Sequence, residues 1–174
     1  MDWVQTIFEL IDLRSFSNLW YWIALAVLWS SASHWVVGVP FDMIVRARRD
    51  GGETLQDLET MVRITTNRML GIARTAGLLL VAFVCFLITT LIILGFGYQV
   101  ELAQAVLMML VPVSLLGLMT LRTARLIAAG ENTGAALFRR LARHRLATQV
   151  LGMLAIFVTA MFGMYQNIQI GALG

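Results

Sequence analysis

The chain contains no lysine: all 13 of its basic residues are arginine. Charge of either sign is scarce, because 13% of the residues are charged, against about 25% in an average soluble domain. In contrast, 59% of the residues are hydrophobic and the mean hydropathy is +0.80. One domain of 174 residues cannot bury that much apolar surface internally. We therefore exclude a soluble globular protein and expect the lipid bilayer to solvate much of the chain.

Cysteine is almost absent as well, since Cys85 is the single one and lies inside an apolar run. This excludes an intramolecular disulfide and a cysteine-based metal cluster. A cleavable secretory signal is also not expected. Such signals need a basic start, whereas the first 17 residues carry Asp2, Glu9 and Asp12 but only Arg14.

Four long stretches lack charged residues, and each reaches the roughly 20 residues that are needed to cross about 30 Å of hydrocarbon. They predict transmembrane helices near residues 18–38, 75–98, 102–122 and 148–168. Arginines alternate between the connections: six lie in the segment 41–74, five lie in the segment 123–147 with Arg122 directly before it, and none lies between spans two and three or after span four. By the positive-inside rule both segments are cytoplasmic and both termini periplasmic. Arginine without lysine is typical of a GC-rich bacterium, so we expect a bacterial inner membrane.

Helical spacing continues outside the spans. Residues 1–16 are amphipathic and predict a helix that lies along the outer interface or, alternatively, packs on the outer end of the bundle. No proline interrupts residues 54–97, which predicts one long helix that protrudes into the cytoplasm, and the segment 123–147 is expected to be helical too. The predicted fold is thus a single all-α integral membrane domain, 1–174. It is an antiparallel four-transmembrane-helix bundle with cytoplasmic helical extensions.

Small and hydroxyl-bearing residues recur at helical spacing within the spans, and such residues allow close helix packing in lipid. They build either the core of the single chain or a face for another protein or another copy. The predicted helix-packing residues are Ser30, Ser33, His34, Ala82, Cys85, Thr89, Gly117, Gly152, Ala155, Thr159 and Gly163.

The two histidines are the first candidates for chemistry. Both lie near the cytoplasmic ends of spans, but His144 stands between Arg143 and Arg145, which disfavours a haem or metal ion there. We expect His34 to hydrogen-bond Ser30 or a neighbouring helix, and His144 to be a solvated interface residue. Apart from Arg122 at the very end of the third span, no span contains an ionisable Asp, Glu, Lys or Arg, which argues against a proton-coupled transporter. The sequence predicts no catalytic, cofactor-binding or metal-ligating residue.

The arginine clusters flank apolar spans, so their nearest anionic partner is the lipid headgroup layer and not a nucleic acid. The predicted contacts to anionic lipid or to a protein partner are Arg46, Arg48, Arg49, Arg139, Arg140, Arg143 and Arg145. The alternative is that these arginines only set the topology.

Three stretches also carry a resemblance: FELIDLRSFSNLWYWIALAVLWSSASHWVVGVPFDMIVRARRD, RHRL and FVTAMFGMYQN. They resemble a family of alphaproteobacterial four-span inner-membrane proteins of this length. Members of that family are often automatically labelled as a component of the SufBCD complex. The label would imply a link to iron–sulfur assembly, although the chain has neither a cysteine ligand set nor a nucleotide-binding motif.

These observations favour a non-enzymatic accessory or scaffold subunit of a larger inner-membrane assembly, with membrane lipids and other subunits as its partners. The alternative is a small homo-oligomeric channel whose pore is lined by Ser30, Ser33, Thr89 or Thr159. A membrane enzyme that acts on lipid is a third and weaker hypothesis.

Overall fold

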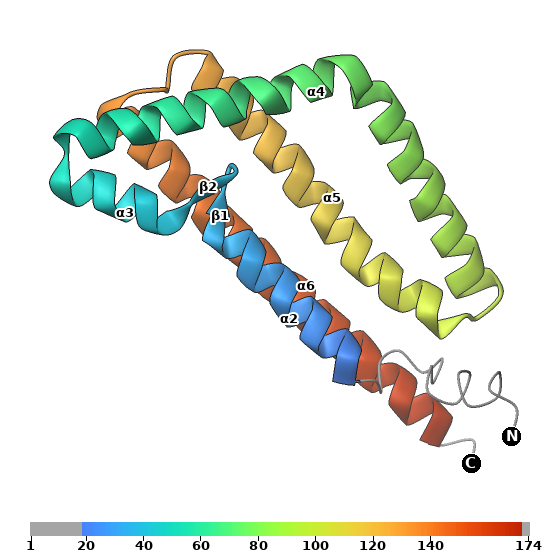
Figure 1. Ribbon diagram of the computed structural model, residues 1–174. Helices are drawn as coiled ribbons and strands as arrows, with labels where there is room; N and C mark the ends of the chain where they lie inside the picture. The colour runs from blue at the N-terminus through green and yellow to red at the C-terminus, as the bar shows by residue number, and fades with distance from the viewer. Residues whose placement is uncertain (1–18, 172–174) are drawn as a thin grey trace, which may run out of the picture.

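The computed structural model describes residues 19–171, and in this part of the chain nearly every residue is helical (Figure 1). The all-α class is thereby confirmed. The predicted interfacial helix over residues 1–16 lies outside the described residues. In chain order the elements are α2 (Leu19–His34), β1 (Trp35–Val36), β2 (Val39–Pro40), α3 (Phe41–Asp50), α4 (Gly52–Ile92), the π-helical turn η2 (Ile93–Gly97), α5 (Glu101–Ala128) and α6 (Gly134–Gly171).

The first predicted span, 18–38, is too long at its C-terminal end. Helix α2 ends at His34, and β1 and β2 follow as an antiparallel hairpin. Its turn places Val37 and Gly38 at φ +53° and +77°, the pair of positive angles that a two-residue hairpin requires. At Gly38 a Cβ atom would lie 2.6 Å from Cγ2 of Thr65, so the turn presses directly on α4.

Three helices are long and apolar enough to cross a membrane: α4 continued by η2, then α5, and then α6. They contain the predicted spans 75–98, 102–122 and 148–168, and α4 and α6 extend beyond them into the segments 41–74 and 123–147. Helix α2 has 16 described residues and is not among these three.

One end of the molecule is a packed core that we call the head. It consists of the hairpin, α3, the start of α4, the end of α5 and the start of α6 (Figure 1). Leu58, Ile127 and Leu137 are at most 1% exposed there. Glu59 of α4 accepts a hydrogen bond of 2.9 Å from the backbone N–H of Gly134. This carboxylate lies at the positive N-terminal end of α6, which favours the contact.

A second core joins α2 to α6 along the apolar part of the molecule. Leu25 and Trp29 of α2 are buried together with Ala155 of α6. Gly152 makes the contact possible, because a Cβ atom on it would lie 2.8 Å from Cε3 of Trp29. Close approach through small residues is how helices associate in lipid.

The far end of the molecule is held by a buried amide. Gln104 of α5 is 1% exposed and donates a 2.6 Å hydrogen bond to the carbonyl of Gly95 in η2. Its side-chain oxygen accepts a hydrogen bond from Gln166 of α6. A buried polar group is tolerated only when it is hydrogen-bonded, so this amide links the ends of η2, α5 and α6.

Between these two ends α4 stands apart. It bends and diverges from the other helices before the chain returns in α5 (Figure 1). No residue between Thr66 and Gly95 is buried. The described helices therefore do not form the closed four-helix bundle that the sequence predicts: α2, α5 and α6 pack together, and the middle of α4 does not join them.

Candidate functional site

Both arginine-rich segments of the sequence meet in the head. Helix α3 contributes Arg46, Arg48 and Arg49, and the start of α6 contributes the other four arginines that were predicted to contact lipid or a partner. The two elements belong to one packed end of the molecule (Figure 1). Arginines from segments almost 100 residues apart in sequence thus lie in one packed end of the molecule, but they differ in their surroundings.

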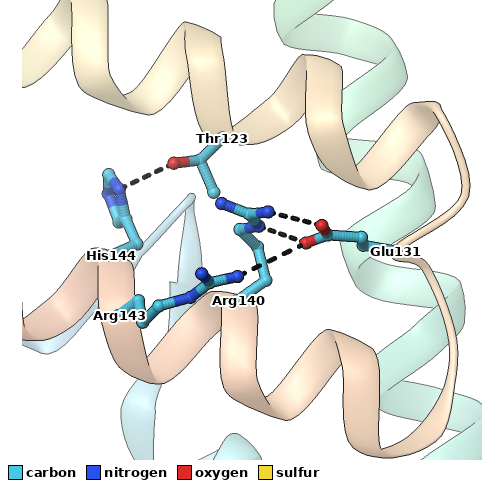
Figure 2. A network of polar contacts seen from close by, with 5 residues as sticks. All are labelled: Thr123, Glu131, Arg140, Arg143 and His144. Atoms are coloured by element: carbon cyan, nitrogen blue, oxygen red, sulfur yellow. Dashed lines mark hydrogen bonds and ion pairs between the residues drawn. The ribbon is translucent and has the colours of Figure 1, made fainter.

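Arg140 and Arg143 face Glu131 in the turn between α5 and α6 (Figure 2). Arg140 donates two hydrogen bonds to the Glu131 carboxylate, and Nη2 of Arg143 lies 3.9 Å from Oε2 of Glu131. The hydrogen bond from Arg140 lowers the pKa of Glu131 below its ordinary value. These contacts fix the turn, so Arg140 is engaged within the chain. The sequence analysis did not single out Glu131.

Three further arginines, Arg46, Arg48 and Arg139, are exposed. Within residues 19–171 none of the three lies within ion-pair distance of a carboxylate. Arg49 is exposed too, with its Nε 3.8 Å from its own neighbour Asp50. Exposed pairs of this kind contribute little free energy, so these four guanidinium groups remain accessible.

Arg145 has a different environment again. Its guanidinium carbon lies 3.5 Å from the centre of the Phe41 ring, at the start of α3. The side chain is half-buried, and its Nε is buried without a hydrogen-bond partner among the described residues. A planar guanidinium stacks well on an aromatic face and keeps its outer N–H groups free.

His144 is buried and not solvated, which corrects the prediction. It is 6% exposed, and its Nδ1 lies 3.1 Å from the Thr123 hydroxyl (Figure 2). Its Nε2 lies 3.5 Å from the hydroxyl of Thr120, which itself donates to the carbonyl of Leu116. Thr120 can therefore only accept from the ring, which places the proton of a neutral imidazole on Nε2 and lets Thr123 donate to Nδ1. The histidine joins α6 to α5.

His34 is exposed, which also corrects the prediction. Its Nε2 lies 4.0 Å from Oδ1 of Asp42, and both side chains are more than half exposed. The ring is edge-on to Trp35, and the expected hydrogen bond to Ser30 is not formed. The hairpin causes the difference, because α2 ends at His34 before the ring can enter the packed part of the helix.

The predicted packing residues divide by helix. On α6 all four are buried: Gly152, Ala155, Thr159 and Gly163. Ser33 is half-buried, and the remaining ones are exposed: Ser30, Ala82, Cys85, Thr89 and Gly117. Thr89 satisfies its hydroxyl by donating to the carbonyl of Cys85 in its own helix, at 2.8 Å. The residues on α2, α4 and α5 thus do not build the core of the single chain.

One sequence signal could have placed His144 correctly. The buried residues of α6 follow one another at steps of three or four: Leu137, Leu141, His144, Thr148, Gly152, Ala155, Thr159 and Gly163. This is the spacing of one helix face. The predicted stripe began at Gly152, and its extension by two turns toward the N-terminus passes through His144.

Among residues 19–171 no group of three or more His, Cys, Asp or Glu side chains is placed to hold a metal ion. Comparison with known proteins gives no match to any family model, any curated protein or any solved structure. The geometry of the chain itself therefore carries the functional argument.

Proposed function

We propose that this chain is a non-enzymatic accessory or scaffold subunit of a larger bacterial inner-membrane assembly. One observation carries the proposal: α4 is anchored at both ends, yet none of its residues between Thr66 and Gly95 is buried. The head holds one end through Leu58 and Val62, and Gln104 holds the other through η2. A membrane helix with fixed ends and an unpacked middle suits a bundle that another subunit completes.

The space beside the end of α4 has the apolar lining that a partner helix in lipid would contact. An apolar groove of about 500 Å³ lies between the end of α4, η2, α5 and α6, and it is lined by Ile92, Phe96, Leu107, Met108, Val111, Pro112, Leu151, Leu154, Ala155, Val158 and Thr159. Ala82, Cys85 and Thr89 are exposed on α4. Small and hydroxyl-bearing residues are those that helix contacts in lipid use. We therefore assign this region to a transmembrane helix of another subunit.

The orientation is part of the same proposal. Eleven arginines belong to the segments 41–74 and 123–147, which meet in the head, and Arg122 directly precedes the second segment. The positive-inside rule then places the head in the cytoplasm and both termini in the periplasm, with α2 as a fourth span. Single cysteines at Gln56 and Ala136, in a Cys85→Ala background, should react with an impermeant maleimide only after spheroplasts are lysed. Labelling of either position in intact spheroplasts would reverse the topology.

The resemblance to the alphaproteobacterial four-span family agrees with this assignment in length and predicted topology. It stays a prediction, as does any connection with iron–sulfur assembly. Neither is needed for the packing argument above.

The native Cys85 gives a direct test of the partner helix, because it is the only cysteine and is exposed on α4. A photoactivatable crosslinker attached at Cys85 in native membranes should capture a protein of foreign sequence, identified by mass spectrometry. The same crosslinker on Thr148→Cys, in a Cys85→Ala background, is the control, because Thr148 is 2% exposed and lies outside the groove lining, and it should capture no foreign protein. Capture of lipid alone from Cys85 would overturn the proposal.

A homo-oligomeric channel is the alternative that the same experiment separates, because its product would be a dimer of this chain. The packing favours it less. Thr159, one of the hydroxyl residues that would line its pore, is 1% exposed and donates to the carbonyl of Ala155. Ser30 lies on a different helix and is exposed.

A further inference from the structure

A pocket of about 300 Å³ opens between α3 and the start of α6, on the side of the head that adjoins the apolar part of α6. Most of its lining is apolar, and its polar groups come from two arginines and one amide. The lining residues are Phe41, Ile44, Val45, Arg48, Phe138, Leu141, Ala142, Arg145, Leu146 and Gln149. No carboxylate is among them, so the charge at the pocket is positive.

Arg145 is the charged residue of this pocket whose side chain is held in a fixed environment. Its guanidinium is stacked on Phe41, its Nε–H is buried without a hydrogen-bond acceptor, and no carboxylate among residues 19–171 pairs with it. Burial of a donor that belongs to a charged group is unfavourable unless an acceptor meets it. An anionic oxygen in the pocket would meet it, and Arg48 adds a second positive charge at the rim.

The position of Arg145 in the chain sets the depth of the pocket. Arg145 is the last charged residue, because residues 146–174 contain no Asp, Glu, Lys or Arg. Leu146 follows it in the pocket wall, and Gln149 lies one helical turn further toward the apolar stretch. On α6 the lining therefore runs from the apolar Phe138 and Leu141 to Arg145 and ends at Gln149, so the cationic group lies where the charged part of the chain meets its charge-free stretch, the level at which a phospholipid presents its phosphate.

We propose that this pocket binds the phosphate of an anionic phospholipid, with Arg145 and Arg48 on the phosphate oxygens and an acyl chain against the apolar wall. Guanidinium groups recognise phosphate through paired N–H···O bonds. The seven arginines that the sequence predicted to contact lipid or a partner therefore have different roles. Arg140 fixes a turn, Arg145 with Arg48 selects a headgroup, and the other exposed arginines attract the anionic surface.

The test uses the full chain, purified in a neutral maltoside detergent and freed of lipid. Its binding is measured by titration with dioctanoyl-phosphatidylglycerol, dioctanoyl-phosphatidylcholine and inorganic phosphate, and the bound lipids are counted by native mass spectrometry. Phosphatidylglycerol should bind saturably at one site and more tightly than phosphatidylcholine. Inorganic phosphate should bind far more weakly, because it has nothing to place against the apolar wall.

Substitutions then assign the site. Arg145→Gln should weaken phosphatidylglycerol binding about tenfold, the loss expected when one charge-assisted hydrogen-bonded contact is removed. Arg145→Lys should recover only part of the affinity, because lysine keeps the charge but loses the planar fork. Arg48→Gln should also weaken binding, and it lies on an exposed position where folding is not at risk. Arg46→Gln is the matched control: the same helix and charge, but outside the pocket lining.

Three outcomes would overturn the proposal. Equal affinities for phosphatidylglycerol and phosphatidylcholine would show that the pocket does not select an anionic headgroup. Binding of inorganic phosphate as tight as that of the lipid would make the pocket a site for a free anion. An effect of Arg46→Gln as large as those of Arg48→Gln and Arg145→Gln would show a diffuse basic surface and no pocket. None of these outcomes bears on the partner helix at α4, which the crosslink at Cys85 tests separately.

Discussion

Helices α4 and α6 are built alike in sequence but packed differently. Each starts in the basic head and runs on into an apolar stretch without proline, and both are long enough to cross a membrane. On α6 a single face stays buried from Leu137 to Gly163, whereas on α4 burial stops at Thr66 and resumes only at Gly95 in η2. Apolar composition therefore says that a helix enters lipid and does not say what it packs against.

The difference lies in what faces each helix. Gly152 of α6 receives the ring of Trp29 from α2, so a small residue is matched by a large one. Gly71 and Gly77 of α4 have no atom within 4 Å of where a Cβ would lie. A small residue stabilises a helix pair in lipid only when something fills the space that it leaves.

The sharpest test of this comparison is to place the same large side chain on both helices. Gly152→Leu should destabilise the chain by roughly 3 kcal/mol, the upper end of the usual range for overpacking, because the new side chain collides with Trp29. Gly77→Leu on α4 should leave stability nearly unchanged in detergent. Thermal unfolding and size-exclusion profiles of the two variants measure the difference, and equal melting temperatures would mean that α2 does not pack on α6.

The two histidines give the next largest effect. His144→Ala removes a buried ring that is hydrogen-bonded to Thr123 and should cost roughly 1–3 kcal/mol. His34→Ala changes an exposed side chain and should stay within about 0.5 kcal/mol of the parent. Chemical unfolding in mixed micelles, followed by tryptophan fluorescence, compares them. A larger loss for His34→Ala would restore the prediction that the sequence alone supported.

The sequence predicted the long helices well because charge-free runs and helical spacing are local signals. Segments 41–74 and 123–147 were expected to be helical and are largely so. The hairpin at Trp35–Pro40 was missed, because Val36, Val37 and Val39 continue an apolar run and only burial against α4 separates them from α2. His144 was wrongly predicted to be solvated, because the prediction rested on its charged neighbours and not on the helix face on which it lies. The sequence could not predict which arginines form ion pairs within the chain, because this depends on where the turn between α5 and α6 places Glu131.

A smaller effect is expected at the turn that Glu131 holds. The hydrogen bond from Arg140 lowers the pKa of Glu131 in the folded chain relative to the unfolded chain. The resulting stability is present above the unfolded carboxyl pKa and is lost as the pH falls through the folded pKa. Glu131→Gln should therefore lower the melting temperature near neutral pH and flatten its acid dependence. Asp57→Asn, at an exposed carboxylate on α4, is the control and should melt like the parent near neutral pH. A parent-like profile for Glu131→Gln would show that the turn does not depend on the ion pair.

The smallest effect on the isolated chain should come from the middle of α4, and that is where the comparison with α6 is most informative. Ala82→Leu enlarges an exposed residue of α4, so the purified protein should unfold like the parent within about 0.5 kcal/mol. Ala155→Leu on α6 enlarges a buried residue of the α2–α6 core and should destabilise the same preparation. In native membranes the prediction for Ala82→Leu changes, because a partner helix seated on α4 would be displaced and the crosslink from Cys85 to a foreign subunit would weaken. A crosslink of unchanged yield would mean that the partner does not contact this face, and destabilisation of the purified Ala82→Leu variant would mean that α4 packs on its own chain after all.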